Sequence, residues 1–189
     1  VGVDASRVRT THDGMDLMLG SRRLHFIDTP GHARHHHCIW DAATRGWFTG
    51  DTFGISYPEF TSECGRWIFP TSTPVQFEPD ALRASVQRLL AADPACIYLT
   101  HYSRVDEVVR LGRLQLDLLE RMADLGRSLQ HAPDRHQRLK DGLLAIYLHS
   151  LAEHRCPMAP DAVAALLAVD LELNAQGIGV WLDREQRPR

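Results

Sequence analysis

The sequence lacks several features that would place it at once in a familiar class of protein. No apolar run approaches the roughly 20 residues that span a bilayer, and no secretory signal is recognisable. Its four cysteines form no C-x-x-C pair, which argues against a zinc ribbon or a dithiol redox motif. It has no long basic block, and 21 Lys and Arg residues stand against 24 Asp and Glu. We therefore expect a cytoplasmic protein with reduced thiols that binds neither membrane nor nucleic acid.

Two parts of the chain differ in the period of their hydrophobic residues. Hydrophobic residues make up 44% of the 189 residues, enough for one core or for one domain with an appendage. Within residues 1–103, the apolar runs MDLML and LHFID, and then CIW and WFTGD, predict two hairpins. A helix is predicted from Pro79, followed by the strand CIYLTH. This alternation favours an α/β layered domain over residues 1–103.

Residues 104–189 predict an all-helical C-terminal extension, because leucines recur there at spacings of three and four. Ser103 with Asp106 fits a capping box at the start of the first helix, and Asp134 is placed to cap the second. Pro160 is predicted to begin the third helix, and Gly177 to end it. The last apolar run, GIGVWL, is too short to assign.

Residues 52–77 predict a long loop between the second hairpin and the first helix. Loops of this length in compact domains are usually functional or disordered, and the aromatic residues in this one argue against disorder. Tyr57, the segment FPTSTPVQF and, further along the chain, Tyr102 are candidates to face a substrate. The alternative is that these residues form local core, and the sequence does not decide between the two.

Three of the predicted strands lead directly into a residue that can bind a metal ion. His32 follows LHFID through a Pro-Gly turn, Asp51 follows WFTG, and His101 follows IYLT. Strand ends in α/β folds meet at an edge of the sheet, where ligands commonly bind. Imidazole nitrogen and carboxylate oxygen suit Zn²⁺, and also Fe and Mn. The pattern therefore predicts a metal site formed by His32, Asp51 and His101.

The neighbouring histidines His35, His36 and His37 are not all predicted to share this site. Consecutive residues of a strand point to opposite faces, so the three rings cannot serve one centre. His36 is a candidate to support the ligands through hydrogen bonds, whereas His35 and His37 are interpreted as bystanders. Three threonines near the strand ends are further candidates for support: Thr29, Thr49 and Thr100.

Three motifs of this sequence resemble the second half of a metallo-β-lactamase-fold hydrolase of the glyoxalase II-like type: TPGHARHHHCIWD, GWFTGDT and IYLTHY. Their order and spacing are fairly specific, and the resemblance covers about residues 14–105. It implies an αββα sandwich with two metal ions at one edge of its sheets. It assigns His32 and His101 as metal ligands and Asp51 as the carboxylate that bridges the two metals.

The sequence also departs from the pattern of this family. Ala33 and His35 stand where the family usually has Thr and Gly, and the family's H-x-H-x-D-H motif is not found, since His12 in TTHDGM does not match. Because the chain also begins VGVDASRV without Met, we expect the C-terminal portion of a longer protein, with a degenerate homologue as the alternative. Half a sandwich should expose one sheet face and therefore aggregate, form a homodimer or be unstable.

The resemblance implies a hydrolase that acts on a small-molecule substrate. Two divalent metal ions, Zn²⁺ first with Fe or Mn as alternatives, would lower the pKa of water so that it attacks an ester, thioester, lactone or related bond. Asp51 would take part in catalysis as the bridging ligand. Zinc β-lactamases of the best-known subclass place Cys at this position, so hydrolysis of antibiotics is disfavoured. The helical extension resembles, in position only, caps that cover the metal cleft in several members, although packing alone explains its leucines.

Two other functions stay open. The same three ligands fit a di-iron enzyme of this fold that performs oxygen or redox chemistry, and metal analysis would separate it from a hydrolase. In the other, this chain alone binds metal weakly, catalyses nothing and acts as a binding module through its helices.

Overall fold

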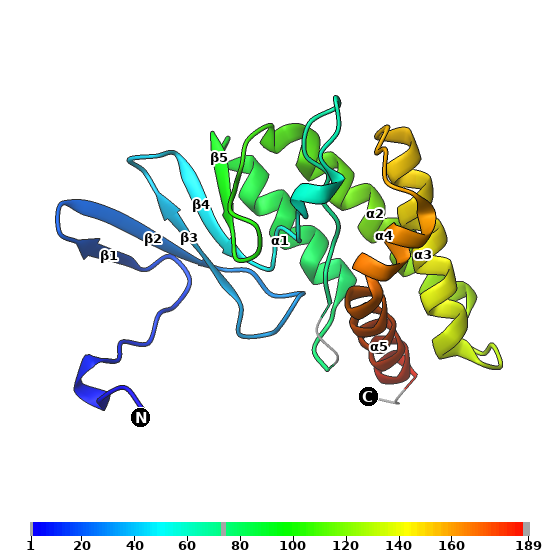
Figure 1. Cartoon of the computed structure of the whole chain (residues 1–189). Coiled ribbons are helices and arrows are strands. Elements are labelled where there is room, and N and C mark those ends of the chain that lie inside the picture. The colour runs from blue at the N-terminus through cyan, green and yellow to red at the C-terminus, as the bar shows by residue number, and fades with distance from the viewer. Residues whose placement is uncertain (1, 73–74, 187–189) are drawn as a thin grey trace.

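The computed structural model describes residues 2–72 and 75–186 and shows a mixed sheet beside a stack of helices (Figure 1). Six strands lie in chain order across the sheet. Neighbouring strands are antiparallel except β4 and β5, which run parallel because helix α1 crosses between them. The strands are β1 (Asp16–Leu19), β2 (Arg22–Asp28), β3 (His37–Asp41), β4 (Gly46–Gly50), β5 (Cys96–Leu99) and β6 (Arg104–Val105). Both predicted hairpins, the predicted strand β5 and the α/β class are thereby confirmed.

Five α-helices accompany the sheet in the described residues: α1 (Pro79–Ala91), α2 (Val108–Ser128), α3 (Arg135–Glu153), α4 (Pro160–Leu166) and α5 (Ala168–Glu185). Two short 3₁₀ helices add Ala5–Arg7 and Pro58–Phe60. Helices α1 and α4 begin at the predicted prolines, whose fixed φ suits the first turn.

The capping box predicted for Ser103 and Asp106 is wrong. Ser103 has a φ of 75°, strand β6 follows it, and α2 begins only at Val108, after Glu107 with a φ of 55°. Asp134 does precede α3, but its φ is 54° and its side chain makes no capping hydrogen bond. Left-handed backbone residues thus precede both helices, a geometry in which the expected side-chain caps do not form.

The prediction that Gly177 ends the third helix is also wrong. Helix α5 continues through Gly177 to Glu185, and GIGVWL forms its last turns. Ile178 and Trp181 are buried beyond this glycine, so packing outweighs its low helix propensity. The break instead falls at Leu167, which divides the predicted helix into α4 and α5.

Helix α1 covers one face of the sheet. Trp47 of β4 donates a hydrogen bond from Nε1 to the carbonyl oxygen of Leu89 in α1, at 3.1 Å. Ile27, Cys38 and Ile97 are buried on the same sheet face. Burial of these side chains anchors strands β2 to β5 and therefore positions the residues that follow their ends.

The opposite face of the sheet carries an apolar row that crosses four strands. Phe26, Ile39, Phe48 and Tyr98 are cross-strand neighbours from β2 to β5. The ring of Phe48 stacks on Tyr98 with centroids 4.6 Å apart, yet Phe48 remains 44% exposed. This partly exposed row agrees with the expectation of one exposed sheet face, and its effect in solution stays a prediction.

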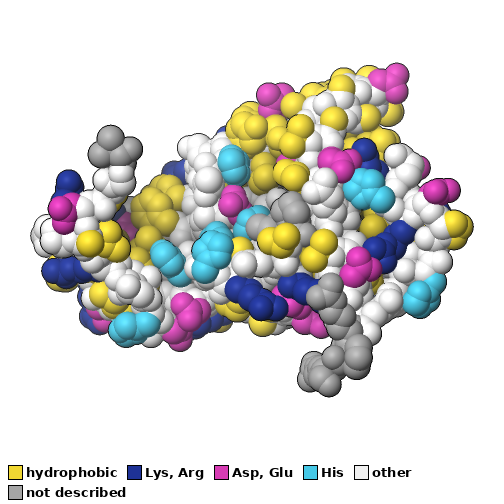
Figure 2. All heavy atoms as spheres, turned by 90° about the horizontal axis from the view of Figure 1, so that it is seen from below, with side chains coloured by type: hydrophobic (Ala, Val, Ile, Leu, Met, Phe, Trp, Pro, Cys, Tyr) yellow, Lys and Arg dark blue, Asp and Glu magenta, His cyan; other side chains and the backbone are white. Residues whose placement is uncertain are grey.

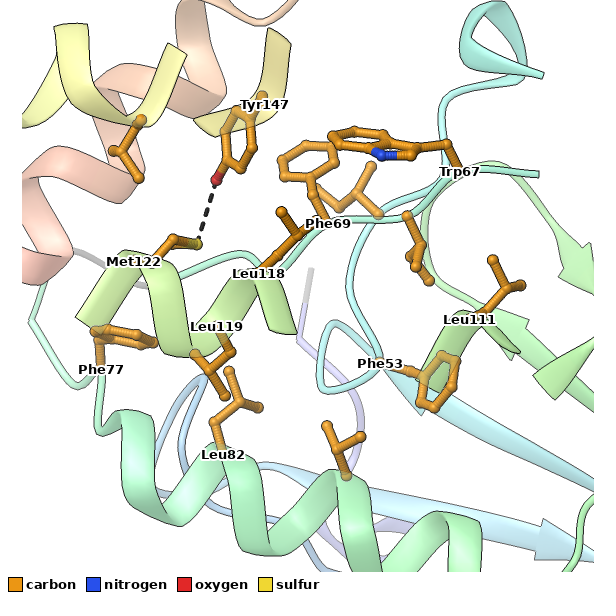
Figure 3. Close-up of a cluster of buried hydrophobic side chains, with 14 of the residues drawn as sticks. Phe53, Trp67, Phe69, Phe77, Leu82, Leu111, Leu118, Leu119, Met122 and Tyr147 are labelled. Atoms are coloured by element: carbon orange, nitrogen blue, oxygen red, sulfur yellow. Dashed lines mark hydrogen bonds between the residues drawn. The ribbon is translucent and has the colours of Figure 1, made fainter. Parts of the chain in front are cut away.

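The long loop of residues 52–77 supplies much of the hydrophobic core. Phe53, Phe60, Trp67 and Phe69 are fully buried, and Figure 3 shows three of them facing side chains of α2 and α3. Trp67 donates from Nε1 to the hydroxyl of Ser150 in α3 at 2.9 Å. For Phe69, which belongs to the candidate segment FPTSTPVQF, the alternative of local core is the correct one. Residues 73 and 74 of the segment FPTSTPVQF lie outside the described residues.

One buried apolar cluster runs from the sheet through the loop into the helices. The division into residues 1–103 and 104–189 therefore stays a prediction about sequence organisation.

All four cysteines are free thiols, and burial raises the pKa of Cys38 to about 11, which keeps that thiol protonated.

Within residues 2–72 and 75–186, no single helix is both long and apolar enough to cross a membrane. Helices α4 and α5 reach that length and composition only when taken together, and they are bent by 65° at the break between them.

Candidate functional site

A tight turn after β2 places His32 against the start of α1. Gly31 has a φ of +130°, and a Cβ there would lie 2.2 Å from the backbone nitrogen of Leu82, so this position requires glycine. The Nδ1 atom of His32 lies 3.0 Å from the carbonyl oxygen of Thr71. A carbonyl can only accept, so Nδ1 carries the hydrogen and the lone pair of the neutral ring lies on Nε2. Nε2 is the atom that faces Asp51.

A second glycine lets β4 deliver Asp51 beside His36. Gly50 has a φ of +52°, and its hydrogen faces the His36 ring where a Cβ would collide. The backbone N–H of Asp51 donates to Nε2 of His36 at 3.3 Å, and Nδ1 of His36 lies 3.0 Å from the hydroxyl of Thr52. Burial lowers the pKa of His36, and the nearby His32 ring acts in the same direction. The neutral His36 ring therefore holds the Asp51 backbone while its Nδ1–H donates to Thr52.

Asp51 lies between the two other predicted ligands. Its Oδ2 is 3.6 Å from Nε2 of His32, and its Oδ1 is 3.5 Å from Nε2 of His101, which follows β5. The sequence thus brings His32, Asp51 and His101 together at one sheet edge. The bystander interpretation of His35 and His37 is consistent with their exposure to solvent. Figure 2 shows histidine side chains gathered with acidic ones on the face seen from below.

The donor atoms of these three residues fit a metal ion in kind but not in number. Oδ1 of Asp51 is buried, and no hydrogen bond reaches it from the described residues. A carboxylate with one oxygen toward each of two imidazoles matches the O and N donors of Zn²⁺, Fe or Mn. However, no group of three His, Cys, Asp or Glu side chains in residues 2–72 and 75–186 is arranged to hold one ion. Each imidazole with its facing oxygen offers two donors, fewer than the three or four protein ligands of a zinc centre.

A cleft of about 420 Å³ opens beside the three residues. Its walls come from the sheet edge, from the long loop and from α5, which contributes Asp170 and Leu173. Tyr57 of the loop and Tyr102 of the β5–β6 turn both line it, with ring centroids 4.5 Å apart. The lining residues are His32, Asp51, Ile55, Tyr57, Thr71, Ser72, His101, Tyr102, Asp170 and Leu173.

A hydrogen bond between distant parts of the chain joins two further lining residues of the cleft, Tyr57 and Asp170. The hydroxyl of Tyr57 donates to Oδ2 of Asp170 at 2.9 Å. Burial raises the pKa of Tyr57, with further contributions from Tyr102 and Asp170, so its hydroxyl stays protonated and donates. Burial also raises the pKa of Asp170, whereas the hydrogen bond from Tyr57 and the nearby His101 ring act against this shift.

Sequence reasoning missed Asp170 altogether. Its helix appears in the sequence as a leucine stripe, and an acidic residue in a first helical turn is ordinarily a favourable interaction with the helix dipole. The available signal was its spacing, because Asp170 stands three residues after Leu167 and four before Asn174, on the buried face. A carboxylate on a buried stripe requires a partner, here Tyr57.

The chain is similar in sequence and in fold to known proteins. The sequence model of the metallo-beta-lactamase superfamily matches residues 2–101, which include His32, Asp51 and His101. A metallo-beta-lactamase family protein from Thermus thermophilus shares the fold with a TM-score of 0.58, at 15% identity, over 92% of this chain and 48% of its own. An archaeal metallo-beta-lactamase superfamily protein from Sulfolobus tokodaii is 26% identical, with a TM-score of 0.49, over 64% of this chain and 41% of its own.

This chain spans less than half the length of either solved structure. Its mixed sheet and helices correspond to part of the metallo-β-lactamase fold. The family match covers more than half of the 189 residues and contains the first two motifs on which the resemblance rests, and the third as far as His101. The chain therefore belongs to the metallo-beta-lactamase superfamily.

Proposed function

We propose that this protein is a metal-dependent hydrolase of small-molecule esters, thioesters or lactones. The observation that carries the proposal is the position of Asp51, which turns one carboxylate oxygen toward His32 and the other toward His101. When bound, two divalent metal ions, Zn²⁺ first with Fe or Mn as alternatives, would supply a water nucleophile of lowered pKa. The proposal includes membership of the glyoxalase II-like subgroup of the superfamily.

The residues of this chain have separate roles in the proposed reaction. His32 and His101 would hold the metal ions through ring nitrogens, and Asp51 would hold them through its carboxylate. The carbonyl of Thr71 fixes which nitrogen of His32 is available, and His36 holds the backbone of Asp51 in place. Tyr57 and Tyr102 line the cleft in which the substrate would lie.

Three residues supply too few ligands for two metal ions, so the proposal includes further ligands from outside this sequence, of the H-x-H-x-D-H type. Two observations support this extension. The chain spans less than half the length of the structures that it resembles. It also leaves Phe48 44% exposed on an apolar sheet face.

Metal analysis combined with hydrolysis assays tests the proposal on protein expressed from its complete coding sequence. We expect two bound divalent ions and hydrolysis of at least one ester, thioester or lactone. Asp51→Asn should lose bound metal and lower the hydrolysis rate by about 100-fold or more. Asp28→Asn is the matched control, because Asp28 is also a strand-end carboxylate but is exposed and does not line the cleft.

Two results would contradict the proposal. The first is a full metal content in the Asp51→Asn variant. The second is an iron-loaded protein that consumes oxygen and hydrolyses none of these bonds, which would favour a redox enzyme of the same fold.

A further inference from the structure

The part of the cleft formed by Tyr57, Tyr102 and Asp170 has the chemistry of a cation site. Asp170 presents a carboxylate there, and the rings of Tyr57 and Tyr102 lie beside it. Carboxylates attract ammonium groups by charge and hydrogen bonding, and tyrosine rings attract them through the negative potential of the ring face. Tyr102 is 41% exposed, so its ring is accessible to a ligand.

The charges of the cleft disfavour an anionic group at the same place. Among the described residues that line it there is no Lys or Arg, whereas there are two carboxylates, Asp51 and Asp170. In the metal-loaded enzyme, the carboxylate of Asp51 would be taken up by the ions, whose positive charge stays at the three proposed ligands. Asp170 would then be the lining carboxylate that no metal ion holds. A carboxylate or phosphate placed beside it would be desolvated without a positive partner and would repel Asp170.

The contacts of Asp170 hold its side chain in a fixed orientation. The Tyr57 hydroxyl hydrogen bonds to Oδ2, and the side chain projects from α5, a regular helix of 18 residues. The φ of Tyr102 is 69°, an unfavourable backbone state that costs about 1–3 kcal/mol. Tyr102 directly follows His101 in the β5–β6 turn, and both residues line the cleft.

We infer that the cleft selects substrates that carry a positively charged amine in addition to the scissile bond. The Asp170 carboxylate and the Tyr57 and Tyr102 rings would recognise this amine. The inference rests on the proposed function for the reaction itself, but the selection of cations is a property of the cleft alone. It separates this protein from hydrolases whose substrates carry carboxylates or phosphates in place of that amine.

Equilibrium binding tests the selection without any turnover. Calorimetry on chelator-treated protein compares phenethylammonium, phenethyl alcohol and hydrocinnamate, which differ mainly in the charge of one end. We expect phenethylammonium to bind about tenfold or more tightly than either of the other two. Asp170→Asn should clearly lower this preference, although Asp51 remains in the cleft of the metal-free protein, and it keeps an oxygen that accepts from Tyr57.

Two further variants test whether the binding preference depends on charges inside the cleft. Asp161→Asn removes an exposed carboxylate of α4 that does not line the cleft, and it should leave the preference unchanged. Leu173→Lys adds a positive charge at a cleft residue that is 38% exposed, without touching the Tyr57–Asp170 hydrogen bond. It should shift the preference toward hydrocinnamate.

Turnover by the metal-loaded protein then separates the two proposals. The substrates are acetylthiocholine, its uncharged carbon analogue and the acetyl thioester of mercaptopropionate, each followed by thiol release. Hydrolysis with a preference for acetylthiocholine that Asp170→Asn abolishes supports both proposals. Cation-selective binding without hydrolysis would leave the selection standing and contradict the hydrolase. Equal or absent binding of phenethylammonium, or an unchanged preference in Asp170→Asn, would overturn the inference whether or not hydrolysis occurs.

Discussion

The glycine immediately before Asp51 should not tolerate a side chain. Gly50 has a φ of +52°, a left-handed conformation that costs a non-glycine residue about 1–2 kcal/mol. A Cβ there would lie 2.4 Å from Cε1 and 2.5 Å from Nε2 of His36. The imidazole would have to move, and the hydrogen bond that it accepts from the Asp51 N–H would be lost. Such a bond contributes about 1 kcal/mol to stability.

We expect Gly50→Ala to lower the free energy of unfolding by about 2–4 kcal/mol, from backbone strain, a displaced ring and the lost hydrogen bond. Gly20→Ala is the matched control, because Gly20 has a φ of +60° and nothing lies within 4 Å of its Cβ position. It should cost about 1 kcal/mol, since the reduced entropy of the unfolded chain offsets part of the strain. Urea unfolding followed by tryptophan fluorescence measures both variants.

A double variant separates the collision from the backbone strain. Gly50→Ala combined with His36→Ala removes the ring that the new Cβ would meet, so the two changes should couple by about 1 kcal/mol or more. The reasoning is refuted if Gly50→Ala costs no more than Gly20→Ala, or if the two sites show no coupling. In either case Gly50 would not be required for the contact that positions Asp51.

Three further predictions concern stability and solubility. Burial lowers the pKa of His154, whose Nε2 lies 3.0 Å from a backbone carbonyl. The stability that the neutral ring contributes to the folded state is therefore present above the unfolded pKa of about 6.5, and it is lost as the pH falls through the lower folded value. His154→Gln should flatten the acid side of the stability profile measured by urea unfolding. Trp67→Phe should lower the free energy of unfolding by about 2–4 kcal/mol, because it leaves the Ser150 hydroxyl without its buried donor and opens a cavity; thermal and urea unfolding check this. Phe48→Ser should reduce aggregation seen by light scattering, at a cost of about 1 kcal/mol for the lost stacking on Tyr98; unchanged scattering would show that the exposed apolar row does not drive association.

Five strands of the sheet and the three residues of the candidate metal site could be predicted because their signals are local. Apolar runs interrupted by turn residues predict strands, and a residue just after a strand lies at the sheet edge whatever else the chain does. His32, Asp51 and His101 each satisfy this rule. His36 contacts the backbone of Asp51 and is not one of the candidate ligands. The sequence predicted a supporting role for His36, but not this contact.

Helix ends were predicted less well because tertiary contacts decide them. Ser103 and Asp106 have the residue types of a capping box, but the chain there first pairs β6 with β5, and α2 starts later. Gly177 has the residue type of a helix terminator. The apolar side chains that follow it, among them Ile178, are buried, and their burial carries the helix past the glycine. In both cases the deciding partner lies elsewhere in the chain.

The wall of the cleft formed by Asp170 could not be foreseen for a related reason. Asp170 and Tyr57 are separated by 113 positions in the sequence, so no local period relates them. Their contact depends on the loop of residues 52–77, whose buried aromatics pack against the helices and fix Tyr57 beside α5. The same loop supplies the Thr71 carbonyl that orients His32. One segment thus determines both the direction of a proposed metal ligand and the charge that a substrate would meet, so substitutions in its core should alter metal binding and substrate preference together.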